Sequence, residues 1–162
     1  MRSKPTDASP ETVDTRSEVK GELFLDILQS TGIARLAVTG ASMLPAIWPG
    51  DVLEVERRGA DEISPGDVVL FTRQGGYTAH RVVAKTRTAD RPLLITRGDA
   101  LPAPDDPISP EQLLGRVVAV LRGGRRLEPR PTRWGRAAAW ILARSEFCVR
   151  LVLRLRRVAQ SL

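Results

Sequence analysis

Short apolar segments separated by turn residues fill the middle of this chain and constrain its fold more than any other feature. Between residues 34 and 122, apolar and polar residues alternate with a period of two, which is typical of half-buried strands. Gly, Pro and Asp interrupt this pattern at close intervals. We therefore predict a mainly β, antiparallel, barrel-like domain over residues 34–130. The predicted strands are 34–39, 51–57, 67–73, 77–86, 92–97 and 115–122.

The segments on either side of this region have a different character. Residues 1–16 show no apolar periodicity and are predicted to form a disordered arm. Residues 17–31 and 131–162 instead repeat apolar side chains at helical spacing, so we expect a helix before the β domain and an amphipathic helix after it. The apolar face expected for the first helix comprises Val19, Leu23, Ile27 and Leu28, with Phe24 at its edge.

The positive charge of the chain is concentrated in its last segment. Residues 131–162 contain seven arginines and the single acid Glu146, so this segment alone carries the net charge of +6 that the whole chain has. A basic amphipathic helix can lie on an anionic membrane surface, pack on the β domain or pair with another copy. Its apolar face argues against nucleic acid as the partner.

Composition also limits location and chemistry. Residues 1–22 are polar, and no run of about 18 apolar residues occurs anywhere, so neither a signal peptide nor a spanning helix is predicted. We expect a protein that is cytoplasmic or peripheral to a membrane. A single histidine, His80, and a single cysteine, Cys148, exclude a disulfide framework and a metal site built from several such ligands. No metal or cofactor is expected.

A serine at the end of the first predicted strand is the main candidate for a reactive group. Ser42 follows Gly40 and precedes Pro45, so it lies on a constrained turn where a nucleophile could be presented. Its own N–H and a neighbouring one could face a developing oxyanion. Gly-x-Ser beside Pro is also ordinary turn chemistry, which leaves a purely structural interpretation open. The residues of this candidate substrate and oxyanion region are Gly40, Ala41, Met43 and Pro45.

The partners that such a serine needs are also present. Serine-histidine-acid chemistry requires a base that takes the hydroxyl proton near neutral pH and a carboxylate that orients this base. His80 lies in a predicted strand, and the loop over 98–110 carries three candidate carboxylates. A half-buried strand histidine and a solvated acidic loop remain the alternative interpretation. The candidate carboxylates are Asp99, Asp105 and Asp106.

Five sequence blocks occur in order along the chain. They are Gly40-x-Ser42-Met43-x-Pro45, Pro49-Gly50-Asp51, Gly66-Asp67-Val68-Val69-x-Phe71, His80-Arg81-Val82-Val83 and Arg97-Gly98-Asp99 with Asp105-Asp106. Together these blocks resemble those of the signal peptidase family. The resemblance is to the endoplasmic-reticulum and archaeal type, in which histidine replaces the lysine base of ordinary bacterial signal peptidases. The form Gly40-x-Ser42-Met43 is also similar to that of LexA-like peptidases, the sister group, which use lysine as the base.

The resemblance implies a mostly antiparallel β catalytic domain and assigns roles to four residues. Ser42 matches the nucleophile, His80 the general base and Asp106 the carboxylate that orients the histidine. Asp99 matches a second acid that supports activity, and the sequence does not decide between Asp99 and Asp106 as the partner of His80. The implied function is that of a serine endopeptidase cleaving a signal or leader peptide beside small residues of a precursor protein.

Two other functions compete with this interpretation. A non-catalytic β module that binds a peptide or a membrane would need none of these reactive groups, so the presence of Ser42, His80 and Asp106 argues against it. A LexA-like regulator that cleaves itself is the second alternative. No helix-turn-helix pattern is recognisable in the roughly 33 residues ahead of the β domain, which argues against that regulator.

Overall fold

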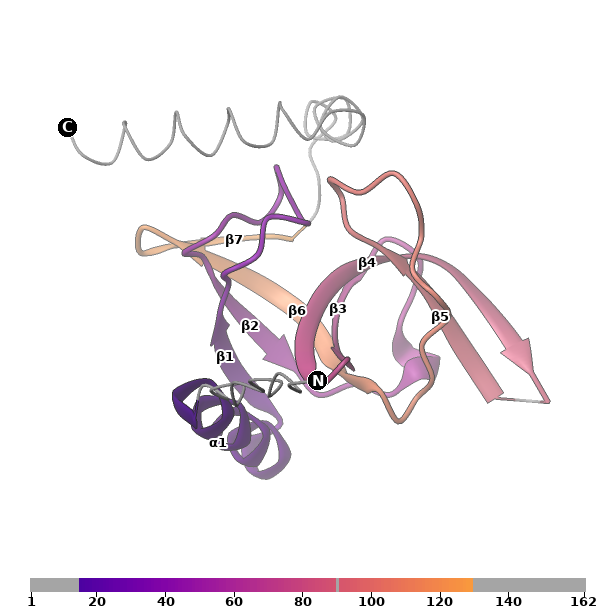
Figure 1. Cartoon of the computed structure of the whole chain (residues 1–162), viewed down its shortest axis with the longest axis horizontal. Coiled ribbons are helices and arrows are strands. Elements are labelled where there is room, and N and C mark those ends of the chain that lie inside the picture. Colours follow the sequence, from indigo (N-terminus) through magenta and orange to yellow (C-terminus); the bar gives the residue numbers. More distant parts are fainter. Residues whose placement is uncertain (1–14, 90, 130–162) are drawn as a thin grey trace, which may run out of the picture.

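The computed structural model describes residues 15–89 and 91–129 of the chain (Figure 1). A helix, α1, precedes strands that pair in one antiparallel sheet of seven strands. The strand order is β1-β2-β6-β3-β4-β5, with β7 added beside β6. The elements are α1 (Thr15–Thr31), β1 (Ile33–Ala37), β2 (Val52–Glu56), the 3-10 helix η1 (Ala60–Glu62), β3 (Val68–Arg73), β4 (Gly76–Thr88), β5 (Arg91–Arg97), β6 (Leu113–Arg122) and β7 (Arg125–Leu127).

The predicted fold class is confirmed, because the described domain is mainly β and its strands are antiparallel. The sheet curls strongly, and β4 bends into an arc between β3 and β5 (Figure 1). In the described part of the chain, no pairing joins the outer strands β1 and β5, so the sheet stays open instead of closing as a barrel.

A tight hairpin between β3 and β4 places His80 within the sheet. Gln74 and Gly75 form the two-residue turn with positive φ values of 49° and 74°, the geometry that favours glycine in hairpins. The pairing that follows aligns Val69 of β3 with His80 of β4, and β5 pairs with β4 on its other side. The only histidine of the chain therefore lies on an internal strand.

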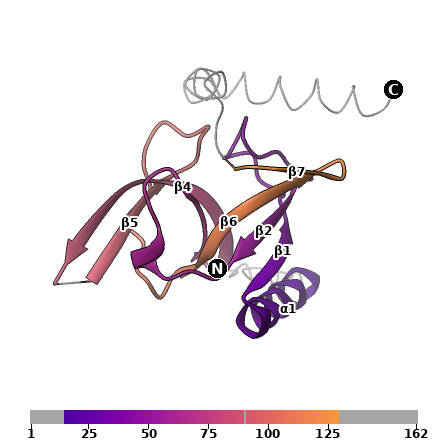
Figure 2. The same ribbon diagram turned by 180° about the vertical axis from the view of Figure 1, so that it is seen from behind.

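Helix α1 packs beside β1, away from β5 (Figure 2). Its buried side chains include Phe24 and Leu28, which are 4% and 2% exposed. Leu23 and Ile27 are 58% and 41% exposed, so the expected apolar face was right at Leu28 but wrong at these two positions. Tyr77 of β4 explains the difference, because its ring packs on Phe24 with centroids 5.6 Å apart and turns this side of the helix inward.

A second apolar cluster fixes the far end of the acidic loop. Leu94 of β5 and Ile108 exchange backbone hydrogen bonds of 3.1 and 2.9 Å, which hold the loop against the sheet. The chain then makes a turn at 110–112 and enters β6 at Leu113. The cluster consists of Ile63, Val69, Phe71, Val82, Leu94 and Ile108.

Two predicted segments lie wholly or largely outside the described residues. They are the arm over 1–16, of which only the last two residues are described, and the basic helix over 131–162 with its predicted membrane contact. Within 15–89 and 91–129, no helix has both the length and the apolar character needed to cross a membrane.

Candidate active site

The turn that carries Ser42 connects β1 to β2 and is fixed by its own apolar residues. Met43, Leu44 and Ile47 are 3%, 0% and 1% exposed, so this turn is packed into the core. Backbone hydrogen bonds from Leu44 N to Ala41 O (3.2 Å) and from Ile47 N to Met43 O (3.0 Å) close it locally. Burial on the C-terminal side of Ser42 therefore holds the serine backbone in place.

An ion pair attaches the same turn to the end of strand β6. Asp51 is 1% exposed and accepts two hydrogen bonds from Arg122 of β6, Nε to Oδ1 at 2.9 Å and Nη2 to Oδ2 at 2.7 Å. Arg122 also donates to Ala46 O at 3.0 Å, and Asp51 accepts the N–H of Trp48 at 2.7 Å. This bidentate pair limits movement of the turn between β1 and β2.

Ser42, His80 and Asp105 form a continuous hydrogen-bonded row. Nε2 of His80 lies 3.0 Å from Oγ of Ser42, and Nδ1 lies 2.6 Å from Oδ2 of Asp105. Because an ionised carboxylate only accepts hydrogen bonds, Nδ1 carries the ring proton and Nε2 accepts the serine hydroxyl. His80 is 4% exposed, so water has little access to this pair.

Asp105 is held by three side chains from three strands. Oδ2 accepts Thr96 Oγ1 at 2.7 Å in addition to His80, and Oδ1 accepts Arg73 Nη1 at 2.6 Å. Burial would raise the pKa of Asp105, but the hydrogen bonds from His80 and Thr96, the charge of His80 and the hydrogen bond from Arg73 together lower it. The carboxylate is therefore ionised at neutral pH.

Asp106 does not take the place that the sequence analysis gave it. Its side chain is 99% exposed, and the ion-pair partner within 4.0 Å is Arg73, not His80. The backbone explains the choice, because the N–H of Asp105 donates to Thr96 O at 2.7 Å and brings Asp105 against β5. The carboxylate in contact with His80 is thus that of the preceding residue.

Asp99, the third candidate carboxylate of the acidic loop, pairs with Arg81 and not with His80. It accepts two hydrogen bonds from Arg81, Nε at 2.9 Å and Nη2 at 2.8 Å, and both side chains are 11% exposed. Arg81 further donates to the carbonyl oxygens of Gly66 and Pro129 at 2.8 and 2.9 Å. Asp99 therefore links the acidic loop to the sheet and does not contact His80.

A glycine that the sequence analysis did not single out lies directly against the site. A Cβ on Gly98 would lie 2.7 Å from the carbonyl oxygen of Ser42 and 3.0 Å from Nε2 of His80. The next turn of the loop adds a backbone hydrogen bond of 2.8 Å from Ala100 N to the same carbonyl oxygen. The acidic loop thus approaches the serine so closely that only glycine fits at position 98.

The predicted substrate and oxyanion region surrounds Ser42, but its members differ in what they can do. A Cβ on Gly40 would meet no atom within 4 Å, so the turn needs no glycine there for space. Met43 is buried, and Pro45 has no N–H to donate. Pro45 therefore cannot supply a backbone donor to an oxyanion, whereas the other three residues each have an N–H.

Comparison with known proteins identifies the class of enzyme to which this protein is related. Residues 6–118 match the family model described as Peptidase S24-like. This match covers more than half of the chain, and the chain belongs to this peptidase family.

Two curated relatives with sequence similarity to this chain are catalytic subunits of signal peptidase complexes. The signal peptidase complex catalytic subunit SEC11 of Scheffersomyces stipitis is 34% identical over 77 residues, which cover 46% of this chain and 46% of the relative. The subunit of the same name from Metarhizium robertsii is 33% identical over 94 residues, covering 51% of this chain and 55% of the relative. The chain thus spans about half the length of the curated relatives it matches, and the predicted resemblance to signal peptidases is confirmed.

Proposed function

We propose that this protein is a serine endopeptidase of the signal peptidase type, with Ser42 as nucleophile, His80 as general base and Asp105 as the carboxylate that orients it. The observation that carries the proposal is the row of contacts from Ser42 Oγ to His80 Nε2 at 3.0 Å and from His80 Nδ1 to Asp105 Oδ2 at 2.6 Å. Nucleophile, base and orienting acid at such separations are the arrangement that serine acyl transfer requires.

The reaction would run in two halves. His80 Nε2 takes the hydroxyl proton as Ser42 Oγ attacks the peptide carbonyl, and Asp105 stabilises the imidazolium that forms. The imidazolium then gives the proton to the leaving amine as the peptide bond breaks, which leaves an acyl ester on Ser42. In the second half, His80 takes a proton from water as the water oxygen attacks the ester. The imidazolium then returns this proton to Ser42 Oγ as the ester bond breaks and the acid product leaves.

Backbone amides of the serine turn are suited to stabilise the oxyanion. Within the described residues, the N–H groups of Ser42 and Met43 donate to no acceptor of the protein itself. Two unpaired donors beside the nucleophile match the requirement for donors aimed at charge that develops in the transition state.

The proposed substrate is a signal or leader segment of a precursor protein, bound in an extended conformation and cleaved beside small residues. Support comes from the two curated relatives, which are catalytic subunits of signal peptidase complexes. The contact between His80 and Ser42 argues against a LexA-like mechanism, in which a lysine is the base.

A serine-directed acylating or phosphonylating probe tests the proposal. The purified protein is expected to gain one probe mass at Ser42, and Ser42→Ala is expected to gain none, as measured by intact-protein and peptide mass spectrometry. Incubation with a synthetic precursor peptide should yield two fragments with the wild type only. Absence of labelling in the folded wild type, or equal labelling of Ser42→Ala, would contradict the proposal. Cleavage confined to the chain itself would instead indicate a self-cleaving regulator.

A further inference from the structure

Arg73, the last residue of β3, reaches the candidate acid from the side opposite to His80. Its Nη1 donates to Asp105 Oδ1 at 2.6 Å, whereas His80 contacts Oδ2. The Asp105 side chain is 7% exposed and the Arg73 side chain 37%, so the arginine is the more solvent-facing member of the pair. No sequence motif marked this residue.

The two carboxylate oxygens of Asp105 thus accept hydrogen bonds from different residues. Oδ2 accepts both His80 and Thr96, while the side-chain hydrogen bond to Oδ1 comes from Arg73. A carboxylate held at one oxygen can turn about its terminal torsion, which has broad minima. Arg73 opposes that rotation with a charge-assisted hydrogen bond, so it fixes the plane in which Asp105 meets the imidazole.

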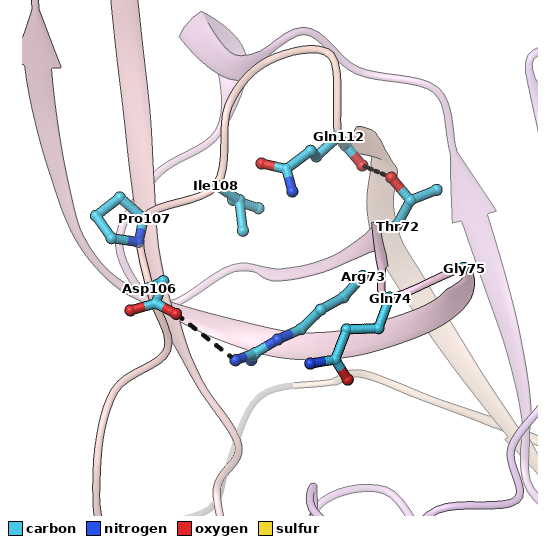
Figure 3. Close-up of a pocket in the computed structure, with 8 residues that line it drawn as sticks. All are labelled: Thr72, Arg73, Gln74, Gly75, Asp106, Pro107, Ile108 and Gln112. Atoms are coloured by element: carbon cyan, nitrogen blue, oxygen red, sulfur yellow. Dashed lines mark hydrogen bonds and ion pairs between the residues drawn. The ribbon is translucent and has the colours of Figure 1, made fainter.

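Arg73 also lines a surface pocket of about 410 Å³. Figure 3 shows the guanidinium between the strand and the loop, with Asp106 on the far side of its ion pair at 4.0 Å. Because Asp106 is 99% exposed, solvent screens this contact and the strong partner of Arg73 is Asp105. The other lining residues are Thr72, Gln74, Gly75, Pro107, Ile108 and Gln112.

We propose that Arg73 is a positioning residue of the peptidase site, acting through the orientation and the charge of Asp105. The inference rests on the proposed function, since it requires that His80 serves as the base. The groups that face Asp105 are His80 from β4, Arg73 from β3 and the neutral Thr96 from β5, with Asp106 beside it in the loop.

The charge of Arg73 gives the inference a distinctive pH signature. The guanidinium and a protonated imidazole compete for the same carboxylate. When the guanidinium is removed, more of the negative charge of Asp105 is left to stabilise the imidazolium, so the base of the reaction becomes protonated at a higher pH. The acid limb of the rate profile should therefore move toward neutral pH. A residue that only supported the fold would lower the rate without moving this limb.

The experiment compares Arg73→Gln, Arg73→Lys and a matched control, Arg87→Gln, by the rate of probe acylation at Ser42 and by peptide cleavage from about pH 5 to 9. Arg87 lies on β4 in an exposed pair with Asp61 at 3.9 Å. Arg87→Gln therefore changes the net charge of the protein by the same amount as Arg73→Gln but removes no contact to Asp105. For Arg73→Gln we expect kcat to fall about tenfold, KM to change little and the acid limb to move upward. Arg73→Lys should recover most of the rate and the original profile.

The outcomes separate this inference from the proposed function. If the wild type itself is not acylated at Ser42, the proposed function fails. If the wild type is acylated and Arg73→Gln matches Arg87→Gln in rate and in pH profile, the function stands and the inference about Arg73 is overturned. Equal losses in Arg73→Gln and Arg73→Lys without a moved acid limb would also overturn it, because the charge would then have no role. Thermal melting of each variant confirms that it is folded.

Discussion

Oδ2 of Asp105 lies 2.6 Å from Nδ1 of His80, while the carboxylate of its neighbour Asp106 is 99% exposed to solvent. Removing the negative charge at each of these two positions in turn therefore tests which carboxylate orients His80. Asp105→Asn should lower kcat by about a thousandfold or more, since an amide cannot hold the imidazole in the required tautomer as a carboxylate does. Asp106→Asn should stay within about twofold of the wild type.

The measurement is steady-state cleavage of a precursor peptide at neutral pH, with circular dichroism to confirm folding. The opposite result, a nearly inactive Asp106→Asn beside an active Asp105→Asn, would return the role to the residue predicted from the resemblance.

Ser42 and His80 should behave as one unit. Ser42→Ala and His80→Ala are each expected to lower kcat to the level of the uncatalysed or oxyanion-assisted reaction, and the double variant should lose little more. A double-mutant cycle measures this directly. Losses that multiply in the double variant would mean that the 3.0 Å contact between Oγ and Nε2 is not used in the reaction.

The sequence was sufficient to predict the sheet and to select two of the candidate site residues. Period-two alternation predicted most of the strands, because the pattern is local to each strand. Ser42 and His80 could be predicted because both stand in recognisable blocks, and they lie in contact in the fold.

The acid could not be chosen in the same way. Asp105 and Asp106 follow each other in a proline-containing loop without periodicity, so no rule of faces distinguishes them. The choice depends on a tertiary hydrogen bond from Asp105 N to Thr96 O. Arg73 was missed for a similar reason, because it looks like an ordinary strand residue until the loop folds over it.

The turn after the acidic loop shows how tertiary pairing overrides a local signal. Ser109 and Gln112 have the spacing of a helix-capping box, and one contact of that box forms, with Ser109 N donating to Gln112 Oε1 at 2.9 Å. Leu113 then pairs with Phe71 of β3, so the chain continues as β6 and not as a helix. Sheet pairing supplies more backbone hydrogen bonds here than one helical turn would.

Gly98 and Gly40 form a matched pair for testing how closely the acidic loop must approach Ser42. Gly98→Ala would place a methyl group 2.7 Å from the Ser42 carbonyl oxygen and 3.0 Å from His80 Nε2, so either the loop or the histidine must move. A displacement of this size at a nucleophile commonly costs about a hundredfold in rate. Gly40→Ala meets no atom within 4 Å and should retain near wild-type activity.

Probe labelling of Ser42 and peptide cleavage measure both variants. Equal activity of the two variants would show that the loop moves aside at little cost. A selective loss in Gly40→Ala would mean that substrate itself occupies the open space beside that residue.

The Arg81–Asp99 pair should support stability more than a surface pair does. Asp99→Asn would leave Arg81, which is 11% exposed, without its bidentate partner, and breaking a buried pair on one side costs about 3–5 kcal/mol at the upper end. Glu62→Gln is the control, because Glu62 and Arg58 are 53% and 36% exposed and solvent screens their pair. Urea denaturation of each variant gives the two free energies. Similar values for both would show that Arg81 is adequately satisfied by backbone carbonyls alone.

The pH dependence of stability should carry the signature of Asp105. Since the folded state lowers its pKa, the ionised carboxylate stabilises the fold fully above the unfolded value of about 3.9, and this contribution is lost as pH falls through the folded pKa. Thermal melts of the wild type and Asp105→Asn from about pH 7 to pH 2.5 should therefore differ by a constant amount down to about pH 4 and converge below it. Arg73→Gln removes one of the interactions that lower this pKa, so its melting temperature should fall by less on acidification than that of the wild type and should level off at a higher pH. A difference between wild type and Asp105→Asn that grows on acidification would mean that the folded state raises the pKa of Asp105, as burial without these three partners would do.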